Sequence, residues 1–183
     1  MKEVAVRYSA VARALHWGVA FAIIAEYLIG LSIDTFGWKN LHLQLGFLIL
    51  LLVSLRIVWR LTHRYPQFDD SLSRFNSIAA HAGHGVLYLL TLIIPLLGVI
   101  LVVTKGKAFN VLGIPFEPLM TPMAYQTRHT IKLVHVYLAH TIIIIAAGHA
   151  LMALLHQFVY KHPILSRMLP EKFADIIEGK NGK

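Results

Sequence analysis

The side chains in this sequence that are best suited to chemistry are its histidines. The 183-residue chain contains 11 histidines and no cysteine. Without cysteine there can be no disulfide, no cysteine-ligated zinc, no iron–sulfur cluster and no covalently attached haem. An imidazole nitrogen can bind a metal ion or a haem iron. The composition therefore favours a histidine-ligated metal or a non-covalently held b-type haem.

The spacing of two histidines places them on one face of a single helix. His135 and His149 are 14 residues apart within one apolar segment. That spacing is about 21 Å along a helix and returns to within about 40° of the starting direction. Each histidine can be matched in depth with one from another apolar segment. The predicted pairs are His42 with His135 near one surface, and His16 with His149 near the other.

Haem b explains two such pairs, because a porphyrin takes one imidazole on each face and two haems need ligands at two depths. Gly46, one turn after His42, and Gly148, beside His149, would clear space for the rings. Glycine is also common at ordinary contacts between membrane helices, so these two residues are weak support alone. A single membrane histidine is usually a hydrogen-bonded packing residue, but four at two matched depths favour ligation.

Several polar residues in the apolar segments keep open roles. His84 or His156 could replace one ligand at the depth of His16, or line a pocket beside that haem, and the role of His81 is undetermined. Glu26 is an acid well inside an apolar segment, which makes it a candidate functional residue because an acid is costly there. It could serve a proton pathway, contact a quinone, or, in its protonated form, hydrogen-bond to a neighbouring helix.

Four apolar segments must position these histidines, at about residues 14–33, 41–61, 78–103 and 133–158. Each is close to or above the ~20 residues that a helix needs to cross hydrocarbon. The absence of two-residue alternation excludes a membrane barrel. Only 14% of residues are charged, against roughly 25% in soluble domains, which excludes a water-soluble enzyme. The predicted fold is all-α: one domain over residues 1–183, an integral membrane four-helix bundle enclosing two b-type haems.

The distribution of basic residues predicts the orientation. Twelve lie on the side of both termini and five on the other side, so the positive-inside rule places both termini in the cytoplasm. Trp17 and Trp59 at the inner interface and Trp38 at the outer agree with this orientation. The tail from about residue 160 is expected to be cytoplasmic, with a short helix from Glu171 to Glu178.

Taken together, these residues resemble the bacterial cytochrome b561 family of four-helix, di-haem membrane cytochromes. The resemblance extends over nearly the whole chain, and it is specific only as a set. The matching positions are His16-Trp17, His42, Gly46, Arg56, Arg60, Tyr65-Pro66, Gly83-His84, Leu87-Tyr88, Pro95, Gly98, His135, Ala139, His149, His156, Leu165, Arg167-Met168 and Pro170.

The resemblance implies an outer haem iron on His42 and His135 and an inner haem iron on His16 and His149. It gives His84 a supporting role, and His156 and Gly46 are further supporting candidates. It also implies ubiquinone as redox partner and a bacterial inner-membrane location. Family members are described as superoxide oxidases that pass electrons to ubiquinone. The family pattern does not call for an acid at Glu26.

Two imidazoles on one haem iron leave no axial position for a substrate, so electron transfer is expected rather than oxygen activation. The leading hypothesis, which the resemblance implies, is a superoxide:ubiquinone oxidoreductase. Five basic residues face two acids on the outer side and would attract an anion, or they could instead contact lipid head groups or haem propionates. The alternative is a cytochrome b anchor subunit that relays electrons between a partner redox enzyme and the quinone pool. A third is a histidine-lined metal or proton transporter. The sequence does not specify catalytic residues, the quinone site or the oligomeric state.

Overall fold

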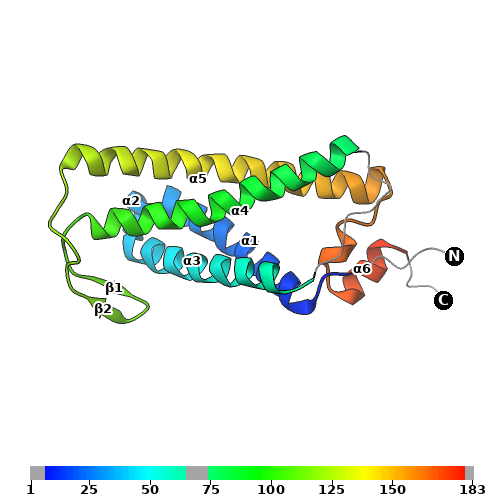
Figure 1. Cartoon of the computed structure of the whole chain (residues 1–183), viewed down its shortest axis with the longest axis horizontal. Helices are drawn as coiled ribbons and strands as arrows, with labels where there is room; N and C mark the ends of the chain where they lie inside the picture. The colour runs from blue at the N-terminus through cyan, green and yellow to red at the C-terminus, as the bar shows by residue number, and fades with distance from the viewer. Residues whose placement is uncertain (1–6, 65–73, 180–183) are drawn as a thin grey trace.

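The computed structural model describes residues 7–64 and 74–179. Its main elements are four long helices: α1 (Ala10–Leu31), α3 (Lys39–Thr62), α4 (Arg74–Val103) and α5 (Tyr125–Leu154) (Figure 1). All four are long and apolar enough to cross a membrane. The prediction of a mostly helical membrane four-helix bundle is confirmed. Some residues used in the sequence analysis lie outside the described residues: Tyr65 and Pro66 of the family resemblance, and Lys2, Lys180 and Lys183 of the count of basic residues.

All four long helices begin before the apolar segments that predicted them. α1 begins at Ala10 because the Ser9 side chain accepts a hydrogen bond from the Ala12 amide (3.2 Å), a common N-cap interaction. It ends at Leu31, and a short helix α2 (Ile33–Phe36) follows. α5 begins at Tyr125 rather than near residue 133, since its first two turns are polar but helical. At its other end, α5 continues into the π-helical turn η1 (Leu155–Val159).

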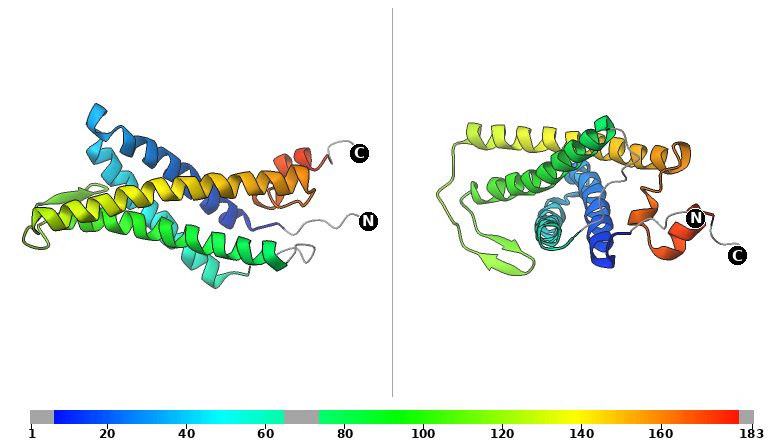
Figure 2. Two further views of the ribbon diagram at one scale, coloured as in Figure 1. Left: turned by 90° about the horizontal axis from the view of Figure 1, so that it is seen from above. Right: turned by 45° about the vertical axis from the view of Figure 1, so that its right-hand side comes forward.

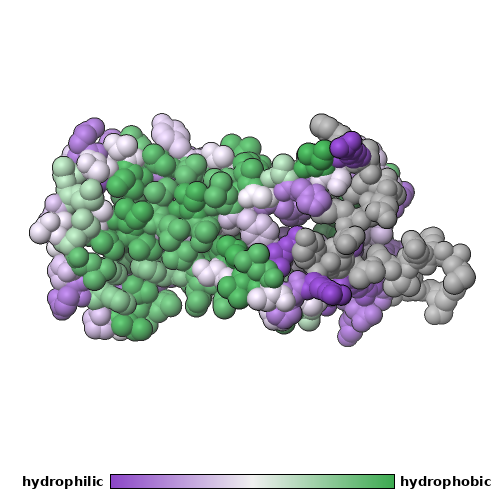
Figure 3. Space-filling view, viewed as in Figure 1, coloured by the Kyte–Doolittle hydropathy of each residue, from purple (hydrophilic) through white to green (hydrophobic). Residues whose placement is uncertain are grey.

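The bundle consists of two antiparallel helix pairs. α1 packs on α3, and α4 packs on α5, while α3 and α4 join the two pairs (Figures 1 and 2). Val19, Ile49 and Val53 form the buried core of the α1–α3 contact. Many large apolar side chains are exposed instead, and they form a broad apolar surface over the helices (Figure 3). Such a surface suits contact with lipid rather than water.

The connection from α4 to α5 contains a small hairpin that the all-α prediction did not include. β1 (Phe109–Val111) pairs antiparallel with β2 (Ile114–Phe116). The two residues between them, Leu112 and Gly113, have φ angles of 50° and 90°, as a tight hairpin turn requires. Gln44 on α3 holds the hairpin: its Oε1 accepts from the Leu112 amide (2.6 Å) and its Nε2 donates to the Asn110 carbonyl (2.9 Å).

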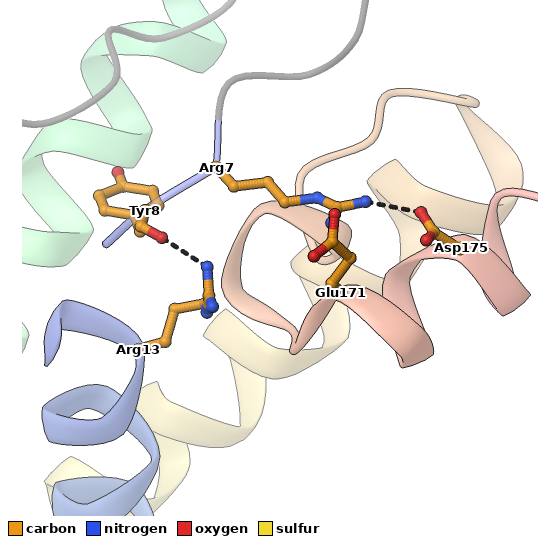
Figure 4. Close-up of polar contacts among 5 residues, drawn as sticks. All are labelled: Arg7, Tyr8, Arg13, Glu171 and Asp175. Atoms are coloured by element: carbon orange, nitrogen blue, oxygen red, sulfur yellow. Dashed lines mark hydrogen bonds and ion pairs between the residues drawn. The ribbon is translucent and has the colours of Figure 1, made fainter. Parts of the chain in front are cut away.

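The tail folds back on the start of α1. It contains the 3₁₀ turn η2 (Ser166–Met168) and α6 (Glu171–Ile177), where the sequence predicted a short helix. The Arg7 guanidinium contacts Asp175 at 2.7 Å and Glu171 at 3.3 Å (Figure 4). The Trp17 indole donates to the Met168 carbonyl (2.9 Å). The beginning and end of the described chain therefore meet at one end of the bundle.

Candidate haem sites

The four histidines singled out by spacing form two pairs at opposite ends of the bundle. We call the end with α2 and the β1–β2 hairpin the loop end, and the end with α6 the terminal end. At the loop end, the ring centres of His42 and His135 are 6.1 Å apart, with the ring planes at 88°. At the terminal end, those of His16 and His149 are 6.4 Å apart, with planes at 69°. The fold thus places together the residues that the sequence paired by depth.

Both spacings fit two axial ligands on one iron. A metal–imidazole bond of about 2 Å, added to the radius of the ring on each side, separates two opposed ring centres by about 6 Å. Among the described residues, no group of three or more histidine, aspartate or glutamate side chains could hold a metal ion. The two histidine pairs, with ring centres 6.1 and 6.4 Å apart, supply two imidazoles each, which is the donor set that a b-type haem iron takes.

The ring of His135 is held by α4. Its Nδ1 lies 3.0 Å from the carbonyl oxygen of Ile94. A carbonyl only accepts, so Nδ1 must carry the proton and Nε2 keeps the lone pair that can bind a metal. Gly98, one turn further along α4, faces the same ring: a Cβ there would lie 3.6 Å from Cε1 of His135. α4 therefore orients this imidazole without supplying a ligand.

The ring of His42 is held by α1. Its Nδ1 lies 2.9 Å from Oε1 of Glu26, although the N–H direction is not that of a regular hydrogen bond. Gly30 faces the ring, since a Cβ there would lie 3.5 Å from Cε1 of His42. Gly46 faces the acid, because its Cβ would lie 3.3 Å from Oε1 of Glu26. Gly46 therefore makes room for Glu26, and its role beside a porphyrin stays a prediction.

The terminal end contains additional polar groups. The ring of His84 lies 5.1 Å from that of His149, and its Nδ1 lies 2.7 Å from the Ala80 carbonyl oxygen on its own helix. A spacing of 5.1 Å is short for two ligands on opposite sides of one iron, so the geometry favours His16 as the partner of His149. Arg56 lies over the Tyr88 ring, 5.5 Å from its centre, and acts electrostatically on both His16 and His149.

Two other candidates contact different parts of the chain. His156 lies in η1, where its ring is 5.3 Å from that of Tyr160 and 6.0 Å from that of His162. Its Nδ1 is buried without a hydrogen bond among the described residues. The π-helical turn thus directs His156 toward the start of the tail. Nδ1 of His81 lies 2.7 Å from the Ser77 carbonyl oxygen, one turn back on α4.

Two polar pairings cross between helices, and the sequence arguments named neither partner, although they left open a hydrogen bond from Glu26 to a neighbouring helix. The first is Glu26 with His42, described above. The second joins the Tyr27 hydroxyl to Nδ1 of His140 at 2.8 Å, between α1 and α5. Each residue is conspicuous in the sequence as a polar side chain in an apolar segment. No sequence signal indicated the partner, because the partner depends on how two helices are rotated against each other.

A comparison with family models decides the relationship. The model described as prokaryotic cytochrome b561 matches residues 7–171, which includes all four paired histidines and all four long helices. The chain belongs to the prokaryotic cytochrome b561 family.

Individual relatives agree with this membership. Cytochrome b561 homolog 2 of Escherichia coli K12 is 30% identical over 177 residues, which cover 92% of this chain and 94% of that protein. Probable superoxide oxidase CybB of Yersinia pestis is 30% identical over 175 residues, covering 91% and 97%. Cytochrome b562 of Cereibacter sphaeroides is 28% identical over 167 residues, covering 85% and 90%. The chain is accordingly a multi-pass bacterial membrane protein that binds b-type haem and transfers electrons.

Proposed function

We propose that this cytochrome holds two b haems and passes electrons from a periplasmic donor, superoxide, to ubiquinone in the bacterial inner membrane. The observation that supports it best is the pair of histidine couples, 6.1 and 6.4 Å between ring centres, at the two ends of one bundle. His42 and His135 would hold the loop-end haem, and His16 and His149 the terminal-end haem. Each haem supplies a one-electron carrier, and two carriers match the two electrons that reduce a quinone.

The residues around the irons favour electron transfer over chemistry at the metal. A haem iron held by an imidazole on each side would have no open position for oxygen or substrate. The Ile94 carbonyl fixes the tautomer of His135, and α1 holds His42 in place. Ligands held rigidly by a second set of contacts move little when the iron changes charge, which suits fast electron exchange. The donor and acceptor would therefore react near the haem edges.

The loop end has the charge that an anionic donor would need. Lys39, Lys105, Lys107 and Arg128 gather there, and none of them takes part in the acid–base ion pairs formed within the described residues. Partial burial lowers the pKa of Lys105, and the positive charges of Lys39, Arg128 and Lys107 lower it further. Cations that outnumber the acids at this end favour a small anion such as superoxide. By the positive-inside rule this end faces the periplasm.

A second function is favoured by the hairpin at the same end. Leu112, Ile114 and Phe116 on the β1–β2 hairpin are exposed, as is Leu119 after it. An apolar projection at the membrane surface could dock a periplasmic redox subunit. The chain would then be a cytochrome b anchor that receives electrons from that partner instead of from superoxide. Both functions use the same haems and the same quinone acceptor.

One experiment separates the two functions. The purified chain in detergent would be supplied with ubiquinone and a steady source of superoxide, and ubiquinol would be measured. Ubiquinol formation above the uncatalysed rate, lost in the His42→Ala/His135→Ala variant, supports the superoxide function. Two bound haems with no ubiquinol formation contradict it, and co-purification of a periplasmic redox subunit would then support the anchor function. A chain that binds no haem at the paired histidines contradicts both.

A further inference from the structure

Glu26 is an acid in the membrane-spanning part of α1, and its carboxylate reaches a proposed haem ligand on another helix. Building on the haem pairs proposed above, we propose that Glu26 is a positioning residue for His42 that lowers the reduction potential of the loop-end haem below that of the terminal-end haem. The arrangement would make electrons run from the loop end to the terminal end.

The first support is the contact itself. Oε1 of Glu26 lies 2.9 Å from Nδ1 of His42, and the two side chains are only 14% and 29% exposed, respectively. A carboxylate in an apolar bundle is costly unless a polar group compensates it. Oε2 makes no hydrogen bond within the described residues, so the contact with His42 carries the compensation that the structure shows. An acid that is buried at such a cost is a candidate functional residue.

The second support is the space made for the pair by two glycines. On α1, Gly30 lies one turn after Glu26 and faces His42, while on α3 Gly46 lies one turn after His42 and faces Glu26. A side chain at Gly46 would place its Cβ 3.3 Å from the carboxylate, closer than ordinary contact distance. Each helix thus contributes one polar side chain and one glycine to the crossing. The close approach of Glu26 and His42 is built into the packing of α1 on α3.

The third support is the chemistry of a carboxylate behind a metal-bound imidazole. With Nδ1 facing Glu26, Nε2 of His42 is the nitrogen available to an iron. A carboxylate that faces Nδ1–H orients the ring and makes it a more basic ligand. Its negative charge also favours the ferric over the ferrous state, strongly so where the dielectric constant is low. Both effects lower the reduction potential of the haem on that imidazole.

The terminal-end pair has the opposite local charge. Arg56, which lies over the Tyr88 ring at this end of the bundle, brings a positive charge near His16 and His149, and a positive charge favours the ferrous state. An acid beside one haem and an arginine beside the other separate the two potentials in a definite order. The haem near the basic loop-end surface becomes the weaker electron acceptor, and the other becomes the stronger.

The test is a redox titration of the holoprotein in detergent, followed by haem absorbance, with the g values of the ferric haems recorded by electron paramagnetic resonance. We expect two one-electron transitions, of which His42→Ala removes the lower. Glu26→Gln keeps the size of the side chain and removes its charge. It should raise the midpoint potential of the lower transition by at least about 59 mV, which is a tenfold change in the equilibrium constant for one-electron reduction. The upper transition should not move.

Tyr27→Phe is the matched control, because Tyr27 is adjacent to Glu26 but bonds to His140. It should leave both transitions in place.

If Glu26→Gln binds two haems with both transitions unchanged, or if His42→Ala removes the higher transition, the inference is wrong although the haem proposal stands. If Glu26→Gln loses the loop-end haem, Glu26→Asp decides: it keeps the charge but retracts it by one methylene. In that case, an upward shift of the lower midpoint potential in Glu26→Asp by less than about 59 mV supports the inference. An unchanged midpoint potential contradicts it. A wild-type chain without two haems contradicts the proposed function itself.

Discussion

At the scale of single residues, the proposed ligands differ in what holds them. His135 is oriented by a backbone carbonyl of α4, and His42 by a carboxylate of α1. A carbonyl adds no charge to the ligand that it orients, whereas a carboxylate does. Two proposed ligands of one haem iron would therefore both be positioned by neighbouring helices, while only one of them would tune the iron electronically.

Replacing His135 by alanine should remove the loop-end haem and leave the other. The haem content should fall from two to one per chain, because His42 alone offers one axial ligand. Haem stoichiometry from the pyridine haemochrome spectrum measures this directly. His140→Ala is the control, since His140 is on the same helix but bonds to Tyr27. A chain that keeps two haems in His135→Ala would rule out this ligand.

At the terminal end, His16→Ala and His84→Ala should behave differently. His16 lies at the spacing of an opposed ligand from His149, 6.4 Å, whereas His84 lies at 5.1 Å. We therefore expect His16→Ala to lose the terminal-end haem, and His84→Ala to retain it with a shifted absorption maximum. The same haem assay, combined with spectra of the reduced protein, distinguishes them. If His84→Ala lost the haem and His16→Ala retained it, His84 would be the ligand and His16 the supporting residue.

At the scale of elements, the short segments at the bundle ends are held by a few polar contacts. The hairpin depends on Gln44, and α6 depends on Arg7. These contacts are exposed or partly exposed at the two ends of the bundle, where water competes for each hydrogen bond and reduces its net value. The ends of the bundle are therefore expected to open more readily than the four long helices.

The ion pairs of Arg7 should contribute unequally. Asp175 is 31% exposed and Glu171 is 81% exposed, and a pair in water is worth little because it is screened. Asp175→Ala should increase hydrogen exchange of the α6 amides severalfold, and Glu171→Ala should change it little. Hydrogen exchange with mass spectrometry measures both. Equal effects would show that burial does not decide the strength of these pairs.

At the scale of the whole molecule, the two ends of the bundle have different charge environments. The loop end has a group of basic side chains at its surface and an acid beside its histidine pair. The terminal end has Arg56 beside its pair. An anion would be attracted to the first surface, and an electron released there would be drawn toward the second site. The difference in charge between the two ends thus favours electron transfer from the loop end to the terminal end.

Reduction of the haems by superoxide should depend on Lys105. Because burial and neighbouring cations lower its pKa, Lys105 loses its charge at a lower pH than an ordinary lysine, and the rate should fall as the pH rises toward that value. Lys105→Gln should slow reduction about two- to tenfold at low salt, and less at high salt. Stopped-flow haem absorbance measures the rates. A rate that is independent of both Lys105 and salt would contradict electrostatic attraction.

Much of this protein could be predicted from local pattern. The four apolar segments had to become helices because a chain in hydrocarbon must satisfy its own backbone hydrogen bonds. His135 and His149 share one helix, so their relative depth and direction follow from helix geometry alone. The hairpin was missed because its strands are three residues each and its turn contains Leu112, a residue that rarely takes a positive φ.

The sequence by itself thus determined which segments are helices, at which end of the bundle each of the four paired histidines lies, and which family the chain belongs to. Only the tertiary structure decided which side chains meet across helices: Glu26 with His42, Tyr27 with His140, and the Ile94 carbonyl with His135. The physical reason is that lipid and neighbouring helices are both apolar. Hydrophobic periodicity therefore does not report how a membrane helix is rotated, and the packing of small residues such as Gly30 and Gly46 sets that rotation.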